Sequence, residues 1–139
     1  MQEKPHKKAG SLAKAVDLVV GVYQTTSSLP VEERYGLTAQ LQRAAISVLS
    51  NIAEGVARGS NRFFMNALYF AGESLSELDT QLVIAHRLGY LDEQETARLG
   101  QRIAEVDRML NGLIASVRRK AAAATASIGV LLGVIGWVL

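Results

Sequence analysis

The chain of 139 residues contains no cysteine, two prolines and few aromatic residues, which make up 6% of it. The lack of cysteine excludes a disulfide framework, a thiolate metal site and a cysteine nucleophile. The two histidines, His6 and His86, could form a metal cage only if carboxylates completed it. This composition favours a binding or structural protein over an enzyme.

Motifs that carry catalysis are also missing. The sequence holds no phosphate-binding loop, no dinucleotide glycine motif and no Ser/His/Asp set. Di-iron bundles use Glu-x-x-His motifs on two helices, and this chain has no such pair of motifs. We therefore expect a protein that is not an enzyme, with no catalytic residue, no metal and no cofactor.

Apolar residues make up 49% of the chain, which is enough for the core of one domain. In four segments they recur at alternating steps of four and three residues, the spacing of one helical stripe. No segment alternates with the period of two that is typical of strands. The four stripes are Leu12, Val16, Val19 and Tyr23; Leu41, Ala45, Val48 and Ile52; Phe64, Leu68, Ala71, Leu75, Leu78, Leu82 and Ala85; and Leu99, Ile103, Val106, Leu110, Leu113 and Val117.

Polar capping residues stand before each segment. Ser11, Thr38, Ser60 and Asp92 are the expected N-caps, and Glu95 completes a capping box with Asp92. Because the loops are short, neighbouring helices must be antiparallel. The prediction is an all-α fold, an antiparallel up-down-up-down four-helix bundle at residues 11–118. A basic N-terminal arm at 1–10 precedes it, and a basic junction with an uncharged apolar C-terminal tail at 119–139 follows.

The net charge of +2 conceals an uneven distribution. In the predicted topology, acidic residues gather at one pole and basic residues at the other. Acids at helix starts and bases at helix ends also complement the helix dipoles, which is the structural alternative. The functional hypothesis is binding of RNA or DNA phosphates by a basic pole made of Lys4, Lys7, Lys8, Arg58, Arg62, Arg118, Arg119 and Lys120.

Several polar residues lie on the second and third predicted helices. The spacing of Glu54 and Arg58 favours an ion pair on one helix face. We interpret the set as a structural polar cluster that fixes helix register or a subunit contact, rather than as a metal or acid/base site. Its members are Arg43, Asn51, Glu54, Glu77 and Gln81.

Two longer motifs resemble a known bacterial family. Residues 33–45 read ERYGLTAQLQRAA and residues 51–55 read NIAEG, followed by the segments AGESL and LGYL. Over residues 9–118 the order and spacing are similar to those of the 23S rRNA intervening sequence proteins. The resemblance implies a four-helix bundle that forms ring-like homopentamers. It also implies a relation to the accessory variability proteins of diversity-generating retroelements, and by analogy a reverse transcriptase as partner.

The C-terminal residues 121–139 carry no charge and follow directly on Arg118, Arg119 and Lys120. As a helix they would be about 28 Å long, close to the roughly 30 Å hydrocarbon core of a bilayer. Three outcomes stay open: a membrane anchor, an extension packed on the bundle or its oligomer, and a flexible end. Since the N-terminal segment has no uninterrupted apolar run, we expect no secretory signal and a cytoplasmic protein, attached to the inner face of the membrane if the anchor forms.

Apolar residues exceed what one core stripe per helix uses. Surplus apolar surface marks an interface, so a homo-oligomer is expected. The leading hypothesis is a homo-oligomeric interaction module that binds RNA or a nucleoprotein. The alternative is a structural or partner-protein scaffold, tethered to the membrane by residues 121–139. The surplus residues are Val20, Phe63, Phe70, Ile84, Met109 and Ile114.

Overall fold

The computed structural model describes residues 5–138, with side chains described from residue 9 onward. This part of the chain contains no strand. Its elements are helix α1 (Pro5–Thr26), the short 3-10 helix η1 (Val31–Glu33), and helices α2 (Leu37–Arg58), α3 (Asn61–Arg87) and α4 (Glu93–Val138).

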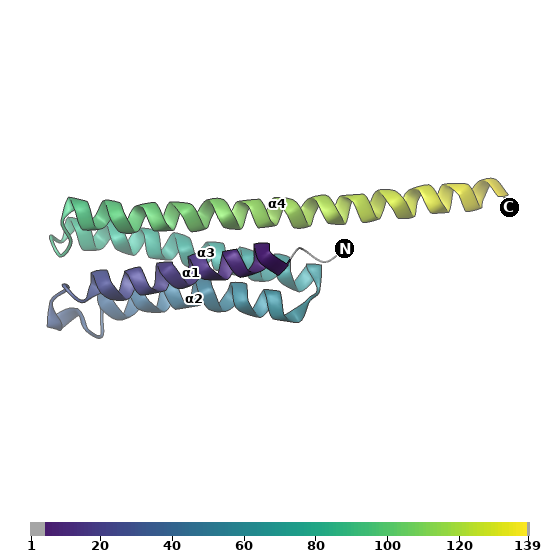
Figure 1. The fold of residues 1–139 in the computed structure, drawn as a ribbon. Coiled ribbons are helices and arrows are strands. Elements are labelled where there is room, and N and C mark those ends of the chain that lie inside the picture. The colour runs from purple at the N-terminus through teal and green to yellow at the C-terminus, as the bar shows by residue number, and fades with distance from the viewer. Residues whose placement is uncertain (1–4, 139) are drawn as a thin grey trace.

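Each helix packs against the next one in the chain, and α1 also packs against α4 (Figure 1). This arrangement confirms the predicted all-α, up-down-up-down four-helix bundle. Helix α4 is far longer than the others, and its C-terminal part runs beyond the end of the bundle (Figure 1). The apolar tail is therefore a direct continuation of the last bundle helix.

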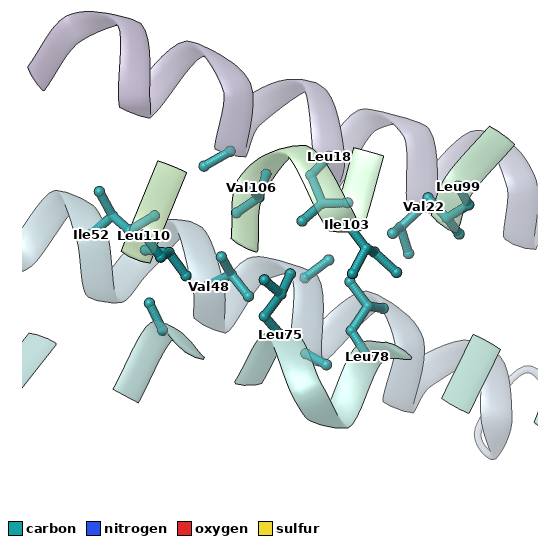
Figure 2. Packing of buried hydrophobic residues seen from close by; sticks show 14 of the residues in the cluster. Leu18, Val22, Val48, Ile52, Leu75, Leu78, Leu99, Ile103, Val106 and Leu110 are labelled. Atoms are coloured by element: carbon teal, nitrogen blue, oxygen red, sulfur yellow. The ribbon is translucent and has the colours of Figure 1, made fainter. Parts of the chain in front are cut away.

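The core lies along the axis between the four helices, where Leu18, Val48, Leu75 and Val106 converge (Figure 2). Fully burying one such side chain contributes about 1.5–3 kcal/mol. The stripes predicted for α2, α3 and α4 are buried in full. They account for most of the hydrophobic core.

The stripe predicted for α1 is wrong by one residue. Ala15, Leu18 and Val22 fill the core, whereas Val16 and Tyr23 are 44% and 45% exposed. Both series have helical spacing and are apolar, so α1 carries two neighbouring apolar stripes. The structure buries one of them and leaves much of the other in contact with solvent.

Two of the predicted N-caps are also wrong. The described part of helix α1 already starts at Pro5, and Ser11 is buried inside the helix. Helix α2 begins at Leu37 rather than after Thr38. Its first N–H donates to the Glu33 carboxylate at 2.9 Å, so an acidic side chain from the preceding 3-10 helix does the capping.

The caps expected for α3 and α4 lie at the predicted positions. Ser60 precedes α3, although its side chain makes no capping hydrogen bond. At the start of α4 the Glu95 N–H donates to Asp92 at 2.7 Å, and the Asp92 N–H donates to Glu95 at 3.0 Å. This reciprocal pair is the predicted capping box.

Candidate interaction surfaces

The basic pole lies at the end of the bundle from which α4 projects. Figure 1 shows the end of α2 and the start of α3 meeting there beside α4. This places Arg58 and Arg62 at the same end as the basic run of α4. Lys4 lies outside the described residues, and only the backbone of Lys7 and Lys8 is described, within α1.

Some of these cations have partners inside the protein. Arg58 forms an ion pair with Glu54 at 3.0 Å and stacks over the Phe63 ring at 5.1 Å. Arg118 donates to the hydroxyl of Tyr69 on α3 and lies 5.9 Å from the centre of that ring. Both arginines therefore have a structural role, and Arg118 attaches α4 to α3 just before the helix leaves the bundle.

Among the described side chains of the pole, the remaining cations are Arg62, Arg119 and Lys120. Within residues 9–138 the ion pairs join Lys14 to Glu105 and Arg58 to Glu54, so these three have no carboxylate partner there. Arg62 and Arg119 are exposed and Lys120 is half-buried. Of the described side chains at this pole, they are the charges that have no acidic partner and that a phosphate group could contact.

A groove between α2 and α3 opens near the same pole, with a volume of about 340 Å³. At its floor the helices approach closely, because a methyl group on Gly55 would lie 2.7 Å from Ala67. The glycine of the NIAEG motif thus serves helix packing. The groove is lined by Asn51, Glu54, Gly55, Arg58, Phe63, Asn66, Ala67 and Phe70.

The predicted polar cluster is divided among separate contacts. Arg43 donates to Gln40 at 3.1 Å, Gln81 donates to Glu77 at 3.0 Å, and Glu54 pairs with Arg58. Each of these contacts lies within one helix and is exposed.

The hydrogen bond that joins α2 to α3 involves residues that sequence reasoning missed. The hydroxyls of Ser47 and Ser74 lie 2.8 Å apart, and Asn51 donates to the Ser47 carbonyl at 2.8 Å. The sequence signal that could have predicted this contact is Ser47, a small polar residue four positions before Asn51. These contacts set the register between the two helices.

At the opposite pole, the ERYG motif organises two loops. Glu33 accepts the N–H of Leu37 through one carboxylate oxygen and the hydroxyl of Tyr90 through the other, at 3.3 Å. Burial, followed by the charge and hydrogen bond of Glu33, raises the pKa of Tyr90. Glu33, Asp92 and Glu95 thus have roles as helix caps, which fits the dipole explanation for the acidic pole.

His86 has a structural environment. Its Nδ1 lies 3.1 Å from the Leu91 carbonyl and 3.2 Å from the Thr96 hydroxyl, across the turn between α3 and α4. Within the described part of the chain, no group of three or more histidine, aspartate or glutamate residues is placed to hold a metal.

Two exposed apolar stripes lie on the outside of the bundle. The α1 stripe consists of Val16, Val20 and Tyr23, and the α3 stripe consists of Phe63 and Phe70; each of these side chains is 44–57% exposed. Ile84 is also exposed, but it lies farther along α3, beyond the polar residues Glu73 and Glu77. Met109 and Ile114, which the sequence placed with this surplus surface, instead pack partly buried against the core.

The model of the 23S rRNA-intervening sequence protein family matches residues 7–112. The chain belongs to this family. The match contains both quoted motifs and ends before the basic run of α4, so the apolar continuation lies outside it.

A solved structure from Bacteroides thetaiotaomicron has a similar fold, with 21% sequence identity and a TM-score of 0.72. The similarity covers 78% of this chain and 97% of the other. That protein is described as one of unknown function from the S23 ribosomal protein family. No curated protein matches the chain.

Proposed function

We propose that the protein is a non-enzymatic, homo-oligomeric interaction module built from its four-helix bundle. The observation that carries this proposal is the pair of exposed apolar stripes on α1 and α3. Isolated apolar residues are common on protein surfaces, but series at helical spacing along two helices form patches that other proteins cover.

The two stripes differ in sequence and lie on helices that do not contact one another. Self-association through two different patches is heterologous, because the first patch of one copy meets the second patch of the next. Such contacts generate a ring when the rotation closes. A closed ring agrees with the pentamer that the family resemblance implies.

The test uses two single variants, Val20→Glu in the α1 stripe and Phe70→Glu in the α3 stripe. Native mass spectrometry of the wild type should give a multiple of the 15.0 kDa chain. Each variant alone should be monomeric, because a buried unpaired carboxylate is strongly unfavourable at an interface. Ser50→Glu, on an exposed position of α2, is the matched control and should assemble like the wild type.

Mixing the two variants then tests the heterologous geometry. Each variant keeps one intact stripe. An equimolar mixture should therefore form a heterodimer with one interface, between the α3 stripe of Val20→Glu and the α1 stripe of Phe70→Glu. A Val20→Glu variant that still dimerises through its α3 stripe would indicate a two-fold contact instead. A wild-type monomer at micromolar concentration would contradict the proposal as a whole.

A second candidate function is binding of RNA through the basic pole. It is favoured by Arg62, Arg119 and Lys120, which have no acidic partner in the described chain and which a ring would repeat on one face. Replacing all three by Gln should weaken RNA binding and reduce the slope of log K against log salt by roughly 0.7 per lost contact with a single strand. Replacing Arg34, Arg43 and Arg87 by Gln changes the net charge equally away from this pole and should preserve the slope.

A further inference from the structure

The part of α4 beyond the bundle, residues 121–138, is named here the apolar extension. It is helical, exposed along its whole length and free of charged residues. Helix α4 is the one described helix long and apolar enough to cross a membrane, and none of its most apolar window is buried. At 1.5 Å per residue the extension spans about 27 Å, close to the roughly 30 Å of a bilayer's hydrocarbon core.

The distribution of side chains around the extension indicates what covers it. A helix that packs on another protein surface has an apolar stripe and a polar face. From residue 128 to 138 every position is apolar or glycine, so no face is suited to water. Leu131, Leu132 and Val134, which point in different directions around the helix, are 56–63% exposed. Lipid surrounds a helix on all sides and satisfies this pattern, whereas a second copy covers one side.

The polar groups of the extension also suit a hydrocarbon environment. The hydroxyl of Thr125 donates to the Ala121 carbonyl at 3.0 Å, and that of Ser127 donates to the Ala123 carbonyl at 2.9 Å. Both donors are therefore satisfied within the helix, as the absence of water in a bilayer core requires. Trp137 lies near the far end, where indole rings are enriched at the lipid–water boundary.

The charges at the near end are complementary to a membrane surface. Arg118, Arg119 and Lys120 directly precede the extension, and Arg62 lies at the same pole of the bundle. Anionic headgroups attract basic clusters next to a membrane segment, and such clusters stay on the cytoplasmic side.

We infer that the apolar extension spans a lipid bilayer and holds the bundle on the cytoplasmic face, with its basic pole against anionic headgroups. This inference goes beyond the proposed function, because assembly through the α1 and α3 stripes does not require a membrane.

Membrane fractionation of cells that express the full chain tests the insertion. The wild type should stay with the membrane pellet in high salt, in alkaline carbonate and after nuclease treatment. Leu132→Arg places a charge near the middle of the extension and should move most of the protein to the supernatant. Gln101→Arg adds the same charge at an exposed position of α4 within the bundle and should leave the protein in the pellet. Release of the wild type by salt or by nuclease would overturn the inference, the latter in favour of RNA.

Trp137, the single tryptophan of the chain, provides an independent measurement. Vesicles of phosphatidylcholine and phosphatidylglycerol are added to the detergent-solubilised protein, the detergent is removed, and the tryptophan emission is recorded. Lipids brominated on their acyl chains should quench it. Emission that brominated lipids leave unquenched would overturn insertion. Native mass spectrometry of Leu132→Arg distinguishes membrane insertion from oligomer assembly. This variant should lose membrane binding and still assemble like the wild type.

Discussion

Helix α4 contains two segments that belong to different environments. Up to Val117, one stripe that includes Leu99, Val106 and Leu110 is buried, and most of the remaining positions are exposed. In the apolar extension no position is buried. The comparison shows that the periodicity of apolar residues decides whether a helix joins a protein core, because a bundle accepts one face of a helix and leaves the others to water.

The two segments are joined without a break for a local reason. Residues 113–128 contain neither glycine nor proline, and residues 121–124 are all alanine. Alanine has the highest intrinsic helix propensity. The helix therefore continues from the bundle into the extension even though tertiary contacts stop, and Arg118 fixes its direction by bonding to Tyr69.

The largest expected difference in stability comes from truncating one leucine in each of the two segments of α4. Leu110 is 1% exposed and Leu131 is 61% exposed. Leu110→Ala should lower the free energy of unfolding of the bundle by about 2–5 kcal/mol, because it leaves a cavity. Leu131→Ala should change it by less than about 0.5 kcal/mol, as for exposed sites in general. Urea denaturation followed by circular dichroism, in detergent for both variants, makes the comparison.

A similar loss of stability in the two variants would contradict the claim that the two segments of α4 lie in different environments. It would mean that the extension folds back onto protein, either its own bundle or another copy. Repeating the measurement at several protein concentrations separates these two cases, since only contact with another copy depends on concentration.

Replacing a glycine by alanine should have opposite effects in the two parts of the protein, destabilising the bundle and favouring helix in the extension. A methyl group on Gly55 would meet Ala67 and Phe64 at 2.7 and 3.1 Å, whereas one on Gly133 would meet nothing within 4 Å. Gly55→Ala should destabilise the bundle by about 1–2 kcal/mol, since overpacking exceeds the gain in helix propensity. Gly133→Ala should raise the helix content of the extension and leave the unfolding midpoint of the bundle unchanged. A destabilised Gly133→Ala variant would indicate close packing at that glycine.

The sequence predicted the parts of the fold that have one clear pattern. Helices α2, α3 and α4 each carry one apolar stripe at helical spacing, and the structure buries all three stripes as expected. In α1 the series with Leu18 and the series with Val19 are both apolar. Periodicity alone therefore could not show which of the two enters the core, and the choice follows from how α1 packs against α2 and α4.

The surfaces were harder to predict than the fold, because a sequence shows the pairs that lie close along one helix but not those between elements. Arg58 and Arg118 belong to the predicted basic pole, yet their contacts with Glu54 and Tyr69 lie within the protein. The cap of α2 comes from Glu33, in a separate 3-10 helix, so the short-range rule that favours Thr38 missed it. Spacing predicted the pair of Arg58 with Glu54, whereas the partners of Arg118 and of the first N–H of α2 are set by packing that spacing does not encode.

The smallest expected effect concerns the pole farthest from the extension. Tyr90 has a pKa raised above its ordinary value of 10.0, first by burial, then by the charge and hydrogen bond of Glu33, and last by Glu32. A group whose pKa is higher in the folded state contributes stability at low pH and loses it as pH rises through that pKa. The bundle should therefore lose stability above about pH 10, while the extension, which has no titratable side chain, keeps its helix.

Glu33→Gln removes the charge and keeps one oxygen, which in the observed geometry can accept from Tyr90 or from Leu37 but not from both. The pKa of Tyr90, followed by the chemical shift of its ring carbons, should fall toward 10.0 in this variant, and the loss of stability at alkaline pH should become smaller. Glu32→Gln is the matched control and should lower the same pKa by less, because Glu32 acts through its charge alone. An equal shift in both variants would contradict this order, because it would mean that Glu33 perturbs Tyr90 no more than Glu32 does.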